Sequence, residues 1–295
     1  MSKPSATLSD KNQPLRRGYP TINGTIRKIK KGYITKNGIW QRCYSGALKF
    51  KYYKPGSTEE YPNDGSAYSF EGNPEENWTL RLWKSGVLKF ESVPGDVEVW
   101  MNGAGGGSNT RNHTAGGGGY IVNQTLQNLS ENIDYPVHIG QGVMEEDGED
   151  TTAFGLTANG GKSAAHGSGG ASGGGGEGGY NTGGSSGAGG SDGGDGAGRG
   201  SGRGMGVSTK EFGVGEPLSA GGGGVYHTND VINNTKPYVS CPGGNLGGGG
   251  GASGGNSDYG QFGSYGGDGA ANTGSGGGNH HTKGGSGRVS LRHIE

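Results

Sequence analysis

Glycine is distributed very unevenly along this chain, and that distribution limits the folds open to it. The first 102 of the 295 residues contain 10 glycines, whereas the following 193 contain 63 of the total of 73. A glycine at about one position in three is typical of collagen, but collagen requires Gly at every third position and abundant Pro. The 11 prolines and uninterrupted glycine runs such as residues 221–224 exclude a triple helix. The chain therefore joins a part of ordinary composition to a glycine-rich part.

Charge and hydropathy exclude several classes of protein. The formal net charge is −1, so a nucleic-acid polyanion has no general reason to bind. A membrane span needs about 18 consecutive apolar residues, and no stretch of the chain comes near that length. Residues 1–20 lack the apolar core of a signal peptide. Two cysteines, Cys43 and Cys241, are too few for a disulfide scaffold, and we expect both to be thiols. We therefore expect a soluble protein that does not use the general secretory route.

Residues 16–75 contain a short repeat that predicts an attachment region, after a polar and flexible arm at residues 1–15. Residues 16–29 and 30–43 align with a period of 14, and each copy contains an Asn-Gly pair. Asn-Gly between β-prone residues favours a two-residue hairpin turn, so each copy predicts one hairpin that needs a partner surface. The alternative is that its basic pairs simply face solvent. The candidate attachment residues are Tyr19, Asn23, Gly24, Tyr33, Asn37, Gly38 and Trp40.

Alternating hydrophobicity predicts that the rest of the fold is mostly β, with little or no α-helix. Residues 47–73 are rich in Tyr and turn residues and predict strands joined by a loop. In residues 78–102, Trp78, Leu80 and Leu82 share one face, and Val97 and Val99 do so after a turn. Such alternation is typical of half-buried antiparallel strands. Together with strands in 119–140 and 287–294, it predicts a β-sandwich.

Residues 155–286 are too rich in glycine and too poor in apolar residues to form a hydrophobic core. Two outcomes remain, disorder or a packing of bare backbones, and ordering glycine is entropically costly. In the polyproline II conformation, with three residues per turn, glycines would let neighbouring backbones approach and form hydrogen bonds. Strands on both sides of the region would anchor such an array. We therefore predict polyglycine-II helices inserted in the sandwich, with residues 76–295 as one glycine-rich domain.

The non-glycine insertions in this domain are expected to be loops and tips, where recognition is usually found. They span residues 108–114, 144–150, 205–219, 225–241, 257–265 and 279–283. Aromatic rings bury much area at low entropic cost and stack on sugars. The alternative is that the rings cap the glycine helices or pack on one another. The candidate receptor-contact residues are Tyr226, His227, Tyr238, Tyr259, Phe262, Tyr265, Arg111 and His113.

The order of several sequence blocks resembles a known family. The succession GVLKF, PGDVEVWMNGAGGG, GGGGYIV, PVHIGQG, TTAFG, NGGKSA and GGSGRVSLR over residues 78–295 resembles the glycine-rich domain of phage tail and prophage proteins. The N-terminal repeat resembles the short Asn-Gly repeats at the start of prophage tail proteins. The resemblance implies a β-sandwich with inserted polyglycine-II helices. A related arrangement occurs in an animal receptor kinase ectodomain, whose secretion and disulfides this chain does not share. The acidic insertion MEEDGED departs from the family pattern.

No pattern in the sequence indicates an enzyme, a cofactor or a metal site. The seven histidines are scattered, and only His280 and His281 are adjacent. Asp192 and Asp195 are spaced somewhat like a calcium-binding repeat, but they form a single copy. Two Arg-Gly pairs, at Arg199 and Arg203, are too few for an RNA-binding tract. No Ser-His-Asp or paired-carboxylate arrangement is evident.

The sequence and the resemblance together predict a non-enzymatic virion structural protein of a phage-like tail, in a fibre, baseplate or tip. The expected partners are tail proteins at the N-terminal region and a glycan or protein receptor on the bacterial surface. A homo-oligomer is expected, because such parts are repeated by symmetry. The chain would be made in the host cytoplasm and reside in the virion. The alternatives are a passive spacer or head decoration, an ice- or polysaccharide-binding extracellular protein, and a disordered RNA-binding tail.

Overall fold

The computed structural model describes residues 47–93, 95–108, 116–127, 129–163, 268–278 and 282–293, the single residues 212 and 219, and the backbone of short strands elsewhere. The chain divides into two compact units, Met1–Gly46 and Ala47–Glu295. The residues described contain strands and no helix. A search of the same residues for a helix long and apolar enough to cross a membrane finds none.

The first unit contains the two hairpins expected from the 14-residue repeat. β1 (Thr21–Ile22) pairs with β2 (Thr25–Ile26), with Ile22 opposite Thr25. β3 (Lys31–Lys36) pairs with β4 (Ile39–Ser45), with Lys36 opposite Ile39. Each pairing leaves two residues between its strands, and in the sequence these are Asn-Gly. This is the spacing that a two-residue hairpin requires, so the predicted hairpins are confirmed.

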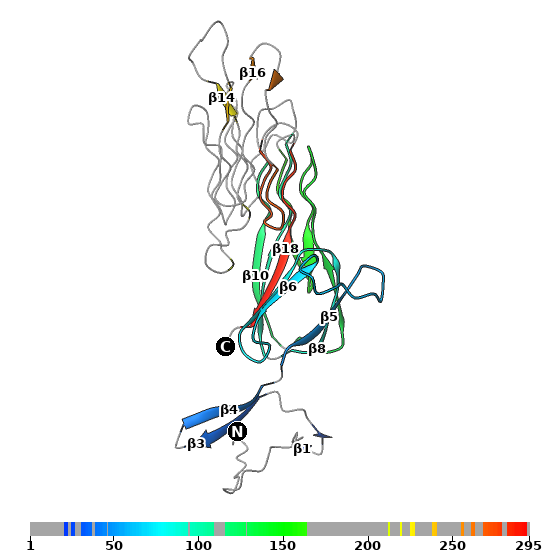
Figure 1. Cartoon of the computed structure of the whole chain (residues 1–295), viewed down its shortest axis with the longest axis vertical. Coiled ribbons are helices and arrows are strands. Elements are labelled where there is room, and N and C mark those ends of the chain that lie inside the picture. Colours follow the sequence, from blue (N-terminus) through cyan, green and yellow to red (C-terminus); the bar gives the residue numbers. More distant parts are fainter. Residues whose placement is uncertain are drawn as a thin grey trace. The chain divides into compact units, whose positions relative to one another are not determined.

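The second unit contains two five-stranded antiparallel sheets, which agrees with the prediction of a mostly β fold with a sandwich (Figure 1). The strand order is β10-β9-β18-β7-β6 in one sheet and β13-β12-β11-β8-β5 in the other. The first sheet consists of β6 (Tyr68–Gly72), β7 (Trp78–Leu82), β9 (Val97–Asn102), β10 (Ile121–Leu126) and β18 (Arg288–His293). The second consists of β5 (Lys49–Tyr53), β8 (Gly86–Ser92), β11 (Asp134–His138), β12 (Thr151–Ala153) and β13 (Leu156–Ala158).

Side chains from both sheets form one hydrophobic core. On β7 the predicted face is buried, since Trp78, Leu80 and Leu82 are at most 2% exposed. Leu88 and Phe90 of β8 join them in the same cluster from the second sheet. Burying each such side chain stabilises the fold by about 1.5–3 kcal/mol. The alternation read from the sequence therefore identifies the core face correctly.

The last strand, β18, lies in the middle of its sheet. Leu291 is opposite both Leu80 of β7 and Val99 of β9. The chain leaves the sandwich after β13 and returns at β18, so the glycine-rich stretch between them is an insertion with both ends held by strands. Within the insertion, β14 (Val225–His227) pairs with β15 (Tyr238–Ser240), and β16 (Gly255–Asn256) pairs with β17 (Gln261–Phe262).

The sequence did not predict the hairpin of β12 and β13. Its turn is Phe154-Gly155, and both residues have positive φ, 55° and 75°. Two consecutive positive φ values are what a type I′ turn needs, and Asn-Gly is the usual sequence for it. A phenylalanine in the first position gives no such signal.

Candidate functional site

Extended segments rich in glycine run on from the strand ends of the second unit, and we call them together the glycine array (Figure 1). The array consists of residues 103–108, 116–120, 140–150, 159–163, 268–278 and 282–287. It begins directly after β9, which is earlier in the chain than the predicted region 155–286. Its backbone groups pair between segments without forming sheet ladders.

Successive amides of residues 103–108 donate hydrogen bonds to three different neighbouring segments in turn, and the order repeats after three residues. All six hydrogen bonds go to carbonyl oxygens at 2.9–3.0 Å. Gly103 donates to Tyr120, and Gly106, three residues later, donates to Gly117 of the same segment. In the same way Ala104 and Gly107 donate to Glu149 and Glu146, and Gly105 and Ser108 donate to Gly285 and Thr282.

Residues 116–120 show the same period. Gly116 and Gly119 donate to Gly277 and Gly274, while Gly117 and Tyr120 donate to Lys162 and Asn159. In each pair of segments, the residue number of the acceptor decreases as the residue number of the donor increases. Neighbouring segments therefore run antiparallel. A repeat of three residues is the period of the polyproline II conformation.

The close approach of these backbones requires glycine. A Cβ built on Gly105 would lie less than 3.0 Å from the carbonyl oxygen of Ser275, and one on Gly116 would meet the carbonyl oxygen of Gly106 as closely. Real Cβ atoms essentially never come within this distance of a backbone atom. Neither glycine has a φ in the left-handed region. Their role is therefore to leave space between backbones, as the sequence argument required.

The acidic insertion lies at one edge of the array and takes part in its hydrogen bonding. The Asp147 carboxylate accepts a 2.7 Å hydrogen bond from the amide of Ser163. The Asp150 carboxylate accepts a 2.8 Å hydrogen bond from the amide of Gly160. The acceptors are three residues apart, and so are the donors. The insertion therefore supplies carboxylate oxygens where a neighbouring backbone would supply carbonyl oxygens. Lys162 also contacts Asp147, at 2.7 Å, and this contact raises the pKa of its ammonium group above the ordinary value.

Three of the predicted receptor-contact residues occupy neighbouring positions in one hairpin. Tyr226 and His227 lie in β14 and Tyr238 lies in β15, with His227 opposite Tyr238. Phe262 lies in β17, opposite Gly255. Four further candidates, Tyr259, Tyr265, Arg111 and His113, lie outside the described residues.

Two of the predicted attachment residues lie in described strands of the first unit. Tyr33 of β3 is opposite Arg42, and Trp40 of β4 is opposite Thr35. The described backbone does not extend to Tyr19, Asn23, Gly24, Asn37 or Gly38.

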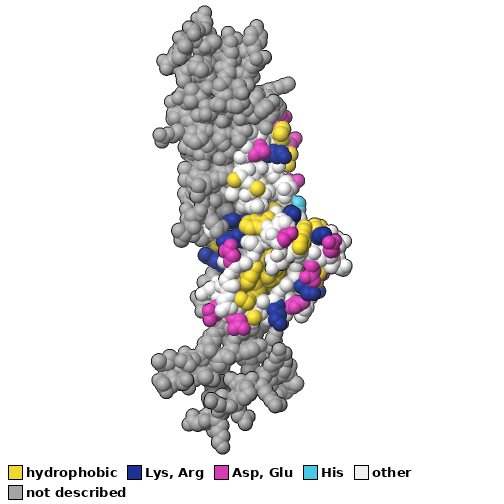
Figure 2. All heavy atoms as spheres, viewed as in Figure 1, with side chains coloured by type: hydrophobic (Ala, Val, Ile, Leu, Met, Phe, Trp, Pro, Cys, Tyr) yellow, Lys and Arg dark blue, Asp and Glu magenta, His cyan; other side chains and the backbone are white. Residues whose placement is uncertain are grey.

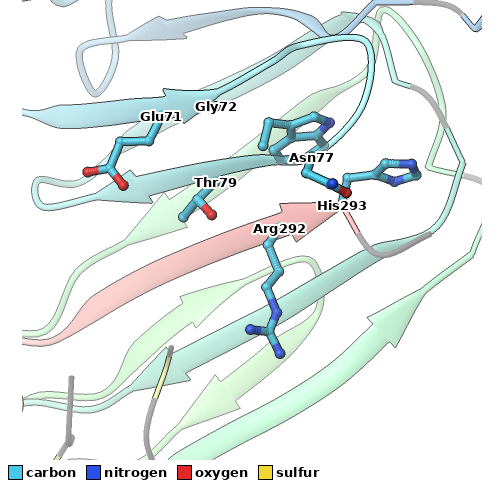
Figure 3. Close-up of a pocket in the computed structure, with 7 residues that line it drawn as sticks. Glu71, Gly72, Asn77, Thr79, Arg292 and His293 are labelled. Atoms are coloured by element: carbon cyan, nitrogen blue, oxygen red, sulfur yellow. The ribbon is translucent and has the colours of Figure 1, made fainter. Parts of the chain in front are cut away.

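The sandwich also has an open groove at one end of the β6-β7-β18 side of its first sheet (Figure 3). Its volume is about 740 Å³, and its lining residues are Glu71, Gly72, Asn77, Trp78, Thr79, Arg292 and His293. The alternating pattern predicts a core position for Trp78, and the structure confirms it. No local pattern indicates the groove, because its lining residues come from β6, β18, β7 and the residue before β7.

The charged and ring groups of the groove are held by neighbours. The His293 ring stacks on the Trp78 ring, with centroids 6.2 Å apart, and its Nδ1 lies 2.9 Å from the carbonyl oxygen of Asp96. Arg292 is hydrogen-bonded to Glu98. Burial alone would raise the pKa of Glu98, but the hydrogen bonds to its carboxylate, above all from Arg292, bring it below the ordinary value.

The visible surface of the second unit carries apolar patches among charges of both signs (Figure 2). The most exposed large apolar side chains among the described residues are Ile133 and Met144, at 51% and 42%. Within the same residues, no three His, Cys, Asp or Glu side chains are placed to bind one metal ion.

Comparison with known proteins identifies the glycine-rich part. The sequence model of the glycine-rich domain family matches residues 85–293, which is more than two thirds of the chain and extends from β8 to the end of β18. No curated protein and no solved structure matches the chain significantly.

Proposed function

This chain belongs to the glycine-rich domain family, and we propose that it is a non-enzymatic structural protein of a phage-like tail that contacts the host surface. In this proposal, the sandwich and the glycine array form a scaffold, the hairpins of the insertion contact the receptor, and the N-terminal hairpins attach the chain to the particle.

The observation that carries the proposal is the three-residue period of the hydrogen bonds in the glycine array. With the close approach at Gly105 and Gly116, it supports polyglycine-II helices. One net hydrogen bond contributes only about 0.5–1.5 kcal/mol, so isolated pairs would not order glycine. Bonds to three neighbours at once, with β9 and β18 anchoring the ends, can do so. A stiff scaffold built in this way is suited to presenting short segments away from a sandwich.

The hairpin of β14 and β15 is the best candidate for receptor contact. It brings Tyr226, His227 and Tyr238 to adjacent positions, whereas the sequence shows them as parts of one long insertion. Tyrosine supplies a large apolar ring and a polar hydroxyl with only two side-chain torsions, which suits recognition of a glycan or a protein. Residues 228–237, between the two strands, are mostly polar in sequence and would contribute further contacts.

The first unit supports a separate role in attachment. Two hairpins of a few residues each are too small to be stable in water without a partner. Met1–Gly46 is also a compact unit of its own, separate from the unit that contains the sandwich and the array. We assign it to docking on other tail proteins through the residues around Tyr33 and Trp40, in a homo-oligomer located in the virion.

Adsorption of the purified full-length chain tests the receptor role. A fluorescently labelled chain should bind intact bacteria of at least one strain in a panel covering both envelope types. The variants Tyr226→Ala and Tyr238→Ala should weaken that binding by about tenfold or more, as expected when an aromatic contact is removed. Tyr53→Ala, at a half-buried tyrosine of β5, is the matched control and should bind like the wild type. Binding to no strain, or equal binding of all variants, would favour a passive spacer.

A further inference from the structure

The outer face of the sheet that contains β18 carries an unusual concentration of arginine. Residues of β7 and β18 that alternate with the core residues point to this face, and they include Arg81, Arg288 and Arg292. Trp100 of β9 lies on the same face, in register with Ser290, which is opposite Arg81. Three cations on two adjacent strands would repel one another unless other groups offset their charge.

One phenylalanine from the insertion lies over this face. Phe212 is 2% exposed, and the guanidinium carbons of Arg81, Arg288 and Arg292 lie 5.4, 5.6 and 5.5 Å from its ring centroid. The Trp100 ring packs against it edge-on, with centroids 6.2 Å apart and an interplanar angle of 66°. Each guanidinium is therefore within the distance at which the face of an aromatic ring attracts a cation.

Two carboxylates offset part of the positive charge around the ring. Glu71 pairs with Arg81 at 2.9 Å, and Glu98 pairs with Arg292. Arg81 and Arg292 thus each pair with an acidic group, and the guanidinium groups of all three arginines lie close to the Phe212 ring. An aliphatic side chain at position 212 could fill the volume but would not attract the cations.

The structure describes two residues of the segment 205–219, which the sequence predicts to be a loop or tip. Both of them, Phe212 and Ser219, are buried. The Ser219 amide donates to the carbonyl oxygen of Thr273 at 2.7 Å, which ties it to the glycine array. Phe212 therefore lies against the sheet, and Ser219 is hydrogen-bonded to the array.

We propose that Phe212 is a positioning residue that fixes the glycine-rich insertion to the outer face of the sandwich. Glycine offers no side chains for packing, so a long insertion needs occasional anchors to limit its conformational freedom. The arginine-lined site for Phe212, made by β7, β9 and β18, is such an anchor. The inference concerns contacts within the chain, and it does not depend on what the hairpins recognise.

Amide hydrogen exchange of the full-length chain tests this proposal. In Phe212→Ala, peptides covering residues 205–219 should exchange roughly tenfold faster or more than in the wild type, while peptides covering 78–92 keep their protection. Phe212→Tyr keeps the ring and should retain wild-type protection, and Phe212→Leu should lie between the two. Unchanged exchange at 205–219 in Phe212→Ala would overturn the proposal. Full protection in Phe212→Leu would show that an aliphatic side chain suffices, and it would overturn the specific role of the ring.

A second measurement needs no variant. In the wild-type chain, the peptide that contains Phe212 should exchange at least about tenfold more slowly than the same peptide in the denatured chain. Exchange at the denatured rate would contradict an anchor at Phe212 even if the substituted chains failed to fold.

Discussion

The amide of Gly105 donates a 2.9 Å hydrogen bond to the carbonyl oxygen of Gly285, which joins the segment after β9 to the segment before β18. These two strands are neighbours in one sheet, so the glycine array continues a pairing that the sandwich has already set. Beyond the sheet, successive residues of 103–108 donate hydrogen bonds to three different neighbouring segments. The backbone is therefore paired on three sides and no longer only within the plane of a sheet.

Gly105→Ala should destabilise the second unit by about 1–3 kcal/mol, because the new methyl group would overlap the carbonyl of Ser275 and force the backbones apart. Gly65→Ala is a suitable control. Gly65 has open space around its Cβ position but a φ of 81°, so its cost comes from backbone strain alone, about 1 kcal/mol. Thermal unfolding of both variants measures the difference. A Gly105→Ala chain as stable as the wild type would rule out close backbone packing at this point.

Leu291→Ala should be among the most damaging single changes in the sandwich. Leu291 is fully buried in the middle of its sheet, and a buried Leu→Ala substitution costs about 2–5 kcal/mol. Denaturant unfolding followed by circular dichroism would report the loss. Ile133→Ala, at a residue 51% exposed, should change the free energy of unfolding by no more than about 0.5 kcal/mol. Similar losses in the two variants would argue against β18 as a central strand.

The ion pair of Glu98 should make stability depend on pH in acid. Because its pKa is lower in the folded chain than in the unfolded one, the carboxylate stabilises the fold at neutral pH. This contribution is lost as the pH falls through the folded pKa. Glu98→Gln should therefore be less stable than the wild type at neutral pH, with the gap closing at strongly acidic pH. Unfolding measured as a function of pH checks this, with the exposed Glu76→Gln as control.

The contact between Lys162 and Asp147 should show in the opposite pH range. The pKa of Lys162 is raised, mainly by its hydrogen bond to Asp147, so this contribution is present at neutral pH and is lost as the pH rises through the folded pKa. Asp147→Asn should return the pKa of Lys162 toward its ordinary value. A titration of the lysine Nζ by nuclear magnetic resonance would detect the change, and an unaltered pKa would contradict the assignment.

Several features of this protein follow from the sequence alone. The alternation in residues 78–102 identifies β7 and β9 and their buried faces, since a strand with one face in a core must repeat every two residues. The Asn-Gly pairs identify the N-terminal hairpins, because few other residues adopt the backbone of that turn. The glycine runs exclude a conventional core and indicate packing by backbone.

Other features required the tertiary structure, because they depend on residues far apart in the chain. Nothing local to residues 288–293 indicates that β18 lies between β7 and β9, and nothing near Phe212 shows that three arginines from other strands surround it. The same holds for the acidic insertion. Its sequence is typical of a solvated loop, whereas in the structure two of its carboxylates accept hydrogen bonds from residues 159–163. Local preference determines which segments are strands, turns or bare backbone. Which of them become neighbours is decided only when the chain returns and closes the sheet.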